Sequence, residues 1–177
     1  MCAYEYYTYD DYIHWEGDWE LIDGIIYAMA PSPVKNHQNL LTLISFTFQK
    51  ELFNCKHCKA YIEMDYKVNE ETVLKPDLSI LCKEDKEERF ISIAPDIIVE
   101  IVSPSTAKRD EKIKFEIYQN EGVKYYLLAY PNDKKIKIYK NINNKFVKEG
   151  DFRDDKYEFK LQNCSFEIDF KEIFERF

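Results

Sequence analysis

The sequence of 177 residues lacks any run of apolar residues that approaches the eighteen or so needed to cross a bilayer. Its start, MCAYEYYTYDDY, is acidic and rich in tyrosine, without the basic and apolar regions of a signal peptide. Internal repeats, low-complexity tracts and linkers are also missing. These absences argue against a membrane-spanning protein or a modular array. They predict a cytoplasmic protein that folds as a single domain over residues 1–177.

Positive charge is scarce as well, because 25 lysines and arginines stand against 33 acids and the net charge is -8. A non-specific nucleic-acid binder needs clustered Lys and Arg to neutralise phosphates, so this balance argues against that class. It leaves room for an enzyme that recruits cations with its acids. Apolar residues make up 45% and aromatic residues 16%, which is the composition of a packed globule.

Cysteine is present five times, at Cys2, Cys55, Cys58, Cys82 and Cys164. The odd number, the irregular spacings and the missing export signal predict reduced thiols. Cys55 and Cys58 form a CxxC motif, but a zinc site needs about four ligands and no second CxxC or HxxxH completes this one. A thioredoxin-like motif would follow a strand and open a helix, whereas this pair follows a helix. We therefore expect free thiols in a turn.

Periodicity and turn signals predict a mixed α/β (α+β) chain with a mixed central sheet flanked by helices. We expect helices over residues 9–16, 34–53, 107–120 and 170–177, and strands over 19–22, 25–30, 61–68, 73–81, 97–102, 124–129, 135–139, 145–148 and 157–161. The segments 97–102, 107–120 and 124–129 form a strand–helix–strand unit. Such units place their two strands parallel, with the ligand site near the carboxyl ends of the strands.

The stretch PDIIVEIVSPST sets Glu100 inside a run of β-branched residues, where an unpaired charge costs several kcal/mol. A second acid, Asp77, follows a proline at the start of the apolar run Leu78–Leu81. If the two strands are neighbours, both carboxylates reach one point. Two buried acids repel each other and one would take a proton, but a divalent cation keeps both ionised. The pair therefore predicts a site for Mg²⁺ (or Mn²⁺).

Three further residues are candidates for the site. Lys114 lies four residues after Asp110, so it either faces a metal-bound water or only pairs with Asp110 on a solvated surface. In the first case it could orient the water, help to deprotonate it or stabilise the charge of a phosphoryl transition state. Glu20 alternates with apolar neighbours in a strand, which predicts partial burial. His37, near the start of a long helix, is either a cap or surface residue or a catalytic group.

A strand with Pro-Asp, a strand with Glu and a following lysine together resemble the PD-(D/E)xK nuclease superfamily, the restriction-endonuclease-like fold. More specifically, the chain is similar to the Uma-two family of restriction-endonuclease-like proteins. The segments that carry the resemblance are WELIDGIIYAMAPSPVKNHQNLL, LKPDLSIL and APDIIVEIVSPSTAKRDEKIKFEIYQNEGVKYYLL. Together they cover most of the chain and are specific, although each alone is a weak signal.

The resemblance implies a role for each matching residue. Asp77 and Glu100 match the metal-binding carboxylates, and the carbonyl of Ile101 would be a third ligand. The motif's usual lysine position, two residues after the acid, holds Val102 here. The family moves the lysine to the following helix, which Lys114 fits.

Two more residues and the function follow from the same resemblance. Glu20 matches an early acid that would be an extra metal or water ligand, and His37 matches a histidine without a derived role. The resemblance implies an Mg²⁺-dependent endonuclease that hydrolyses phosphodiester bonds in DNA, with a homodimer as an expected assembly. The alternative is a catalytically inactive nuclease-fold module that binds nucleic acid or a protein partner. A glycosidase with a pair of carboxylates would leave the lysine helix and the Pro-Asp placement unexplained.

Overall fold

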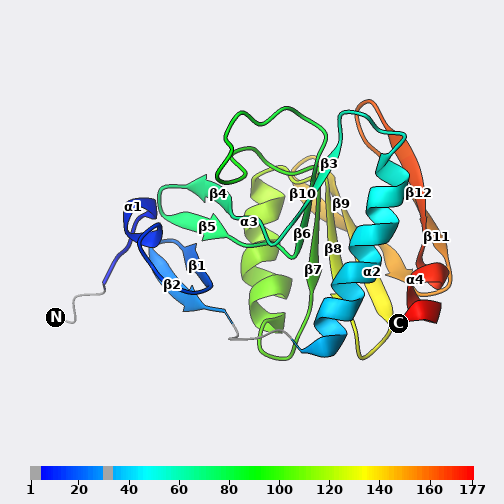
Figure 1. The fold of residues 1–177 in the computed structure, drawn as a ribbon, viewed down its shortest axis with the longest axis horizontal. Coiled ribbons are helices and arrows are strands. Elements are labelled where there is room, and N and C mark those ends of the chain that lie inside the picture. Colours follow the sequence, from blue (N-terminus) through cyan, green and yellow to red (C-terminus); the bar gives the residue numbers. More distant parts are fainter. Residues whose placement is uncertain (1–4, 30–33) are drawn as a thin grey trace.

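The centre of the molecule is a six-stranded sheet in the order β10-β9-β8-β7-β6-β3 (Figure 1). The computed structural model describes residues 5–29 and 34–177, so Cys2 and part of the expected strand 25–30 lie outside the described residues. The strands of this sheet are β3 (Lys59–Ile62), β6 (Leu78–Leu81), β7 (Ile97–Ile101), β8 (Tyr125–Tyr130), β9 (Lys135–Ile142) and β10 (Lys145–Phe152). As predicted, β7 and β8 run parallel, and the other neighbouring strands of this sheet run antiparallel.

A smaller sheet and a hairpin flank the main sheet on either side (Figure 1). The smaller sheet has the order β2-β1-β5-β4, and the hairpin pairs β11 with β12. Their strands are β1 (Trp19–Ile22), β2 (Ile25–Ala28), β4 (Tyr66–Asn69), β5 (Thr72–Leu74), β11 (Lys156–Lys160) and β12 (Ser165–Asp169). The helices are α1 (Tyr9–Tyr12), α2 (Lys35–Leu52), the π-helix η1 (Arg109–Lys114), α3 (Phe115–Asn120) and α4 (Phe170–Arg176).

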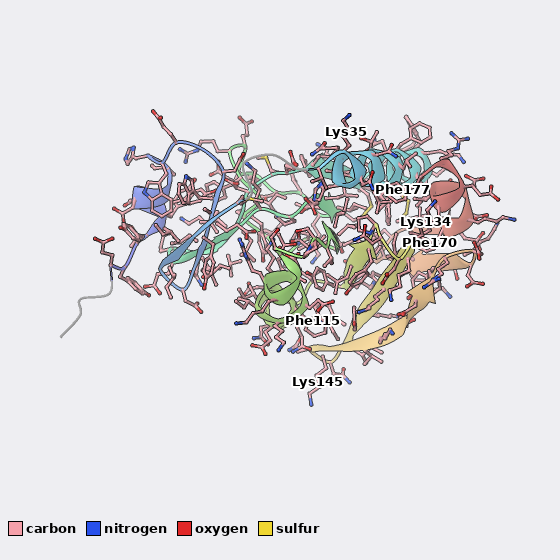
Figure 2. The ribbon with its side chains drawn as sticks, turned by 90° about the horizontal axis from the view of Figure 1, so that it is seen from below. Lys35, Phe115, Lys134, Lys145, Phe170 and Phe177 are labelled. Carbon is pink, nitrogen blue, oxygen red and sulfur yellow. A yellow bond between two sulfur atoms is a disulfide. The ribbon has the colours of Figure 1, made fainter. Side chains whose placement is uncertain are left out.

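The main sheet is covered on both faces, so its central strands are apolar on both sides. Lys35 at the start of α2 and Phe115 at the start of α3 lie on opposite sides of the sheet (Figure 2). Along β7, Ile97, Val99 and Ile101 share a core with α2, while Ile98 shares a core with α3. Because side chains alternate along a strand, Glu100 falls on the same face as Ile98 and points toward η1 and α3.

Two expected strands were wrong because each is really two strands in different sheets. The expected strand 61–68 is divided between β3 and β4, and Glu63 between them has a positive φ of 49°. The expected strand 73–81 is divided between β5 and β6 by the segment around Pro76, which has no N–H to donate to a ladder. Both divisions occur where the chain crosses from the smaller sheet to the main sheet.

The helix expected over 107–120 forms in an altered shape, because its first part is the π-helix η1. A π-helix adds a residue to the turn and is common at functional sites. The expected helix 9–16 was too long, since α1 ends at Tyr12. Strand β12 was not predicted.

The expectation of free thiols was wrong for four cysteines. The structure pairs Cys55 with Cys164 and Cys58 with Cys82. Sequence spacing could not show this, since 109 residues separate the first pair. The end of β6 and the turn between β11 and β12 bring Cys82 and Cys164 to the CxxC turn after α2.

In the part of the chain that the structure describes, no helix is both long enough and apolar enough to span a membrane.

Candidate active site

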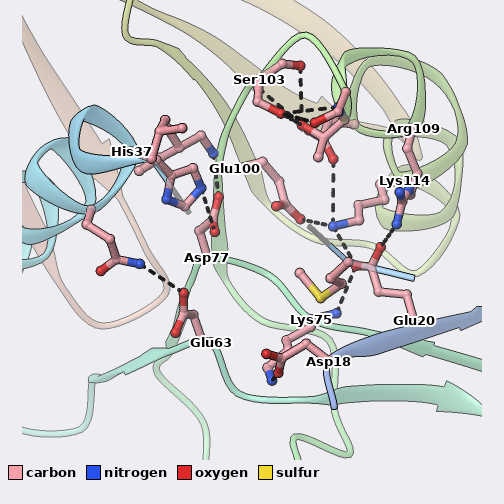
Figure 3. Close-up of a pocket in the computed structure, with 17 residues that line it drawn as sticks. Asp18, Glu20, His37, Glu63, Lys75, Asp77, Glu100, Ser103, Arg109 and Lys114 are labelled. Carbon is pink, nitrogen blue, oxygen red and sulfur yellow. Dashed lines mark hydrogen bonds and ion pairs between the residues drawn. The ribbon is translucent and has the colours of Figure 1, made fainter. Parts of the chain in front are cut away.

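One pocket, with a volume of about 230 Å³, is lined by all six residues that the sequence singled out (Figure 3). It lies where β1 of the smaller sheet approaches β7, the start of α2 and η1. The predicted residues that line it are Glu20, His37, Asp77, Glu100, Ile101 and Lys114. The structure therefore brings together side chains that are up to 94 positions apart, as the sequence order of Glu20 and Lys114 shows.

The two strand acids lie opposite each other at the end of the β6–β7 ladder. Leu78 pairs with Val99, so the next pair outward in this antiparallel register is Asp77 with Glu100. The Asp77 Oδ2 atom accepts a hydrogen bond of 2.6 Å from the N–H of Ile101. Because the N–H and C=O of a strand residue point to the same side, the Ile101 carbonyl is also directed toward the Asp77 edge. Asp77, Glu100 and Ile101 therefore line the same pocket, with Asp77 turned toward His37 and Glu100 toward Lys114 (Figure 3).

Lys114 is the centre of a buried ion-pair network. Its Nζ atom lies 2.6 Å from Glu20 Oε1, 3.0 Å from Glu100 Oε1 and 3.7 Å from Asp110 Oδ1. The lysine is only 3% exposed, so the alternative of a surface pair with Asp110 is wrong. The face of η1 that carries both residues is turned toward the sheet rather than toward water.

Glu20 joins the smaller sheet to this network. It is 1% exposed, and its Oε2 atom lies 2.8 Å from Nη1 of Arg109. Its Oε1 atom also accepts a hydrogen bond of 3.1 Å from the N–H of Lys75. The Arg109 guanidinium lies 5.1 Å from the ring centroid of Tyr27, which holds it in place. Glu20 is therefore more buried than the sequence predicted and is already neutralised by two cations.

The electrostatics separate the roles of the charged groups. Burial raises the pKa of Glu100 well above its ordinary value, because the opposing effect of Lys114 is smaller. Burial lowers the pKa of Lys114, but the surrounding carboxylates outweigh burial and raise it. Burial also raises the pKa of Glu20, but Lys114 and Arg109 outweigh it and the net shift is downward. The carboxylates around Lys114 therefore favour its protonated form, while burial favours the neutral form of Glu100, an effect that an added cation would oppose.

His37 reaches the same acids from the first turn of α2. Its Nε2 atom lies 3.2 Å from Asp77 Oδ1, while its buried Nδ1 atom has no hydrogen-bond partner among the described residues. Burial lowers the pKa of His37, but the hydrogen bond and charge of Asp77 outweigh burial and raise it. The Asp77 contact fixes the orientation of the ring beside the pocket.

The donor set fits a divalent cation. The carboxylates of Glu20, Asp77, Glu100 and Asp110 are buried, and the permanent cations beside them are Lys114 and Arg109. Four carboxylates therefore share two permanent cations, since Lys114 contacts Glu20, Glu100 and Asp110, and Asp77 is paired with the titratable His37. Paired carboxylates with a carbonyl are the usual protein ligands of Mg²⁺. Asp77, Glu100 and the carbonyl of Ile101 are the groups that could hold it.

Comparison with known proteins agrees with this geometry. The family model of Uma2, described as "Putative restriction endonuclease", matches residues 4–158. The chain belongs to the Uma2 family. This confirms the Uma-two resemblance that the motifs predicted.

Two relatives extend the finding beyond the family model. An uncharacterised protein from Synechocystis sp. is 30% identical over 170 residues, covering 90% of this chain and 88% of the other. The crystal structure of a "putative nuclease" from Anabaena variabilis matches with a TM-score of 0.75 at 17% identity, over 96% of this chain and 98% of that one. At this identity the second match shows the fold, which is the mixed α+β fold with a central mixed sheet.

Sequence reasoning missed the roles of three residues around this Uma2 site. Asp110 was seen only as a surface partner of Lys114, although the spacing of four between Asp110, Lys114 and Tyr118 marks one helix face. Tyr118 donates a hydrogen bond of 2.9 Å to Glu100 Oε1. The positive charge of Arg109 was visible in the sequence but its bond to Glu20 was not, because the two residues are 89 positions apart.

Proposed function

We propose that the chain is a metal-dependent endonuclease that hydrolyses phosphodiester bonds in DNA, with Mg²⁺ or Mn²⁺ as its cofactor. The observation that carries the proposal is the excess of carboxylates in the buried site, where Glu100 shares Lys114 with Glu20 and Asp110, and Asp77 is paired with the titratable His37. A buried charge without a partner is costly, and a divalent ion would provide that partner. Family membership supports the same chemistry.

The residues of the pocket have different roles in the proposed reaction. A bound Mg²⁺ would supply Lewis-acid polarisation of the phosphate and a water of lowered pKa. Asp77, Glu100 and the Ile101 carbonyl would hold it. Lys114 keeps its proton between Glu20 and Glu100, so it serves as a fixed positive charge that stabilises negative charge developing on the phosphoryl group. The surrounding carboxylates raise the pKa of Lys114, which disfavours a role for this lysine as the general base that deprotonates the attacking water.

The substrate class is supported by the approach to the pocket. Helix α2 begins at Lys35, and Val34, His37 and Gln38 at this end line the pocket. The free N–H groups of a helix N-terminus carry partial positive charge and favour phosphate. A backbone phosphate can therefore approach from this side even though the whole chain is acidic.

Cleavage of plasmid DNA tests the proposal. The wild-type protein should nick the plasmid with Mg²⁺ or Mn²⁺ and not with EDTA, while Asp77→Ala and Glu100→Ala should be inactive and keep their circular dichroism spectra. Glu158→Ala is the matched control, because Glu158 is an exposed strand carboxylate of β11. Cleavage that persists in both site variants would refute the proposal. A parallel RNA substrate shows whether DNA is the preferred nucleic acid.

The alternative is an inactive nuclease-fold module that binds nucleic acid or a protein partner. The net charge of -8 repels DNA, so within this alternative it favours the protein partner. Calorimetry separates the two functions. Heat of binding on titration with Mn²⁺, lost in Glu100→Ala, supports the enzyme, and no metal binding by the folded wild type supports the module. The homodimer stays a prediction.

A further inference from the structure

Four cysteines from three distant segments meet at the end of the molecule away from the pocket. Cys55 and Cys58 follow α2, Cys82 follows β6, and Cys164 precedes β12. The sulfur atoms of Cys55, Cys58 and Cys164 all lie within 4.8 Å of one another, and Cys82 is paired with Cys58. The two cysteine pairs therefore form one group of four sulfurs, the cysteine cluster.

The proximity of the sulfurs allows a tetrathiolate metal centre once both disulfides are reduced. Zn²⁺ bound to cysteine has Zn–S bonds of about 2.3 Å in a tetrahedron, which places the sulfurs about 3.8 Å apart. Three sulfurs lie mutually within 4.8 Å and the fourth, that of Cys82, is bonded to one of them, so reduction of both disulfides would leave four thiols around one point. Two independent disulfides have no reason to touch each other, whereas four ligands of one ion must converge.

The backbone around the cluster is already fixed. The Cys55 N–H donates a hydrogen bond of 2.8 Å to the carbonyl of Leu52, and the Cys58 N–H donates one of 2.8 Å to the carbonyl of Cys55. The Cys82 N–H donates a hydrogen bond of 2.7 Å to a carboxylate oxygen of Asp96. Cys55 is 6% exposed and belongs to the hydrophobic core. Ligands held in this way lose little conformational entropy when they bind a metal.

We propose that the four cysteines, in their reduced form, bind one Zn²⁺ as a structural tetrathiolate site. Four cysteine ligands and no open position are the pattern of structural rather than catalytic zinc. Lys56 and Lys83 are sequence neighbours of the ligands, and nearby cations favour the thiolate form that a metal needs. Each thiol gives up its proton when it binds.

The disulfides and the zinc site are alternative states of the same four sulfurs. Each disulfide takes up two electrons and two protons to become two thiols, and a thiol reductant supplies them as it forms its own disulfide. The sequence predicts a cytoplasmic protein, and the thiols of such proteins are kept reduced. The reduced cluster is then the form that meets zinc.

The position of the cluster indicates a role in stability rather than in cleavage. Asp77 precedes β6 and Cys82 follows it, while His37 and Cys55 lie at opposite ends of α2. Five steps along β6, at about 3.4 Å each, separate Asp77 from Cys82 by roughly 17 Å, so the cluster does not touch the pocket. The zinc would join the end of α2, the end of β6 and the β11–β12 hairpin. This inference does not depend on the nuclease proposal.

Metal analysis of the full chain tests the inference. Protein purified with a non-thiol reductant and without oxygen should contain one zinc ion per chain, as measured by inductively coupled plasma mass spectrometry. Co²⁺ in place of Zn²⁺ should give a thiolate-to-cobalt charge-transfer band. It should also give the intense d–d absorption bands, in the red part of the visible spectrum, of a tetrahedral site. Cys82→Ser and Cys164→Ser should lose the zinc, and Cys82→His should retain it. Cys2→Ser, a cysteine outside the described residues, is the matched control and should keep it.

Either kind of failure overturns the inference. One is a folded, fully reduced wild type that binds neither zinc nor cobalt, with both disulfides found by peptide mapping of the unreduced protein. The other is zinc that stays bound when Cys82 and Cys164 are replaced together. If the serine variants do not fold, the cobalt spectrum of the wild type decides, because it reports thiolate ligands directly.

Discussion

Two lysines in this protein form ion pairs with glutamates, one in a buried pocket and the other on the exposed surface. Lys114 in the pocket contacts Glu20 and Glu100 at 2.6 and 3.0 Å, and Lys156 on β11 contacts Glu167 at 3.1 Å. The distances are similar, but the Lys114 side chain is 3% exposed and that of Lys156 is 57% exposed. The difference between the two regions is therefore water rather than geometry.

Water decides what each cluster contributes. On the β11–β12 hairpin, solvent and salt screen the charges, and the pairs add little to folding. In the pocket each charge has lost its hydration, so the cluster is tolerated only if the charges balance. Among the described groups the acids outnumber the permanent cations, because three carboxylates share Lys114 and Asp77 is paired with the titratable His37. Such a cost is typical of a functional site and is unexpected in a purely structural network.

The largest expected effect is on Lys114. Lys114→Met removes the cation from three buried carboxylates and should lower the free energy of unfolding by about 3–5 kcal/mol, the cost of breaking a buried ion pair. Lys156→Met should leave it unchanged within error. Urea unfolding followed by fluorescence measures both. Equal effects of the two substitutions would show that burial does not distinguish the regions.

A smaller effect is expected from the metal. Mg²⁺ at a hundred times its dissociation constant should raise the free energy of unfolding of the wild type by about 2.7 kcal/mol, because it binds only the folded state. Glu100→Gln should abolish this gain, since a neutral amide is a weak metal ligand, while Glu167→Gln should retain it. Thermal unfolding with Mg²⁺ and with EDTA is the measurement. A gain that survives in Glu100→Gln would place the metal elsewhere.

The sequence was sufficient to predict the acids of this site for a physical reason. Glu100 interrupts a run of β-branched residues, and Asp77 breaks another beside a proline, so both acids stand out against apolar strands. The parallel pair β7–β8 also followed from the pattern, since a helix that links two apolar strands forces that arrangement. Features that depend on local periodicity were therefore predictable.

Features that depend on long-range contacts were not predictable from the sequence. Nothing local in Arg109 reveals its bond to Glu20, and nothing in Cys164 reveals its proximity to Cys55, because both contacts arise from the packing of separate sheets and turns. The π-helical turn at Asp110 is also invisible to a search for a period of 3.6. The expected strand 73–81 failed because the residues before and after Pro76 are both apolar, although they belong to different sheets.

The smallest expected effect is a dependence of stability on pH that only the buried cluster produces. Burial raises the pKa of Glu100 in the folded protein above its ordinary value near 4.5. In the pH range just above that ordinary value the unfolded chain has released this proton while the folded chain still holds it. Folding takes up a proton in this range, so without metal the free energy of unfolding falls as pH rises, by at most about 1.4 kcal/mol per pH unit for one group. Glu100→Gln should flatten this slope in urea unfolding with EDTA, and Glu167→Gln should leave it unchanged. A wild-type slope in Glu100→Gln would mean that the carboxylate is already charged in the folded protein without a metal, so that Lys114 alone would be enough to balance it.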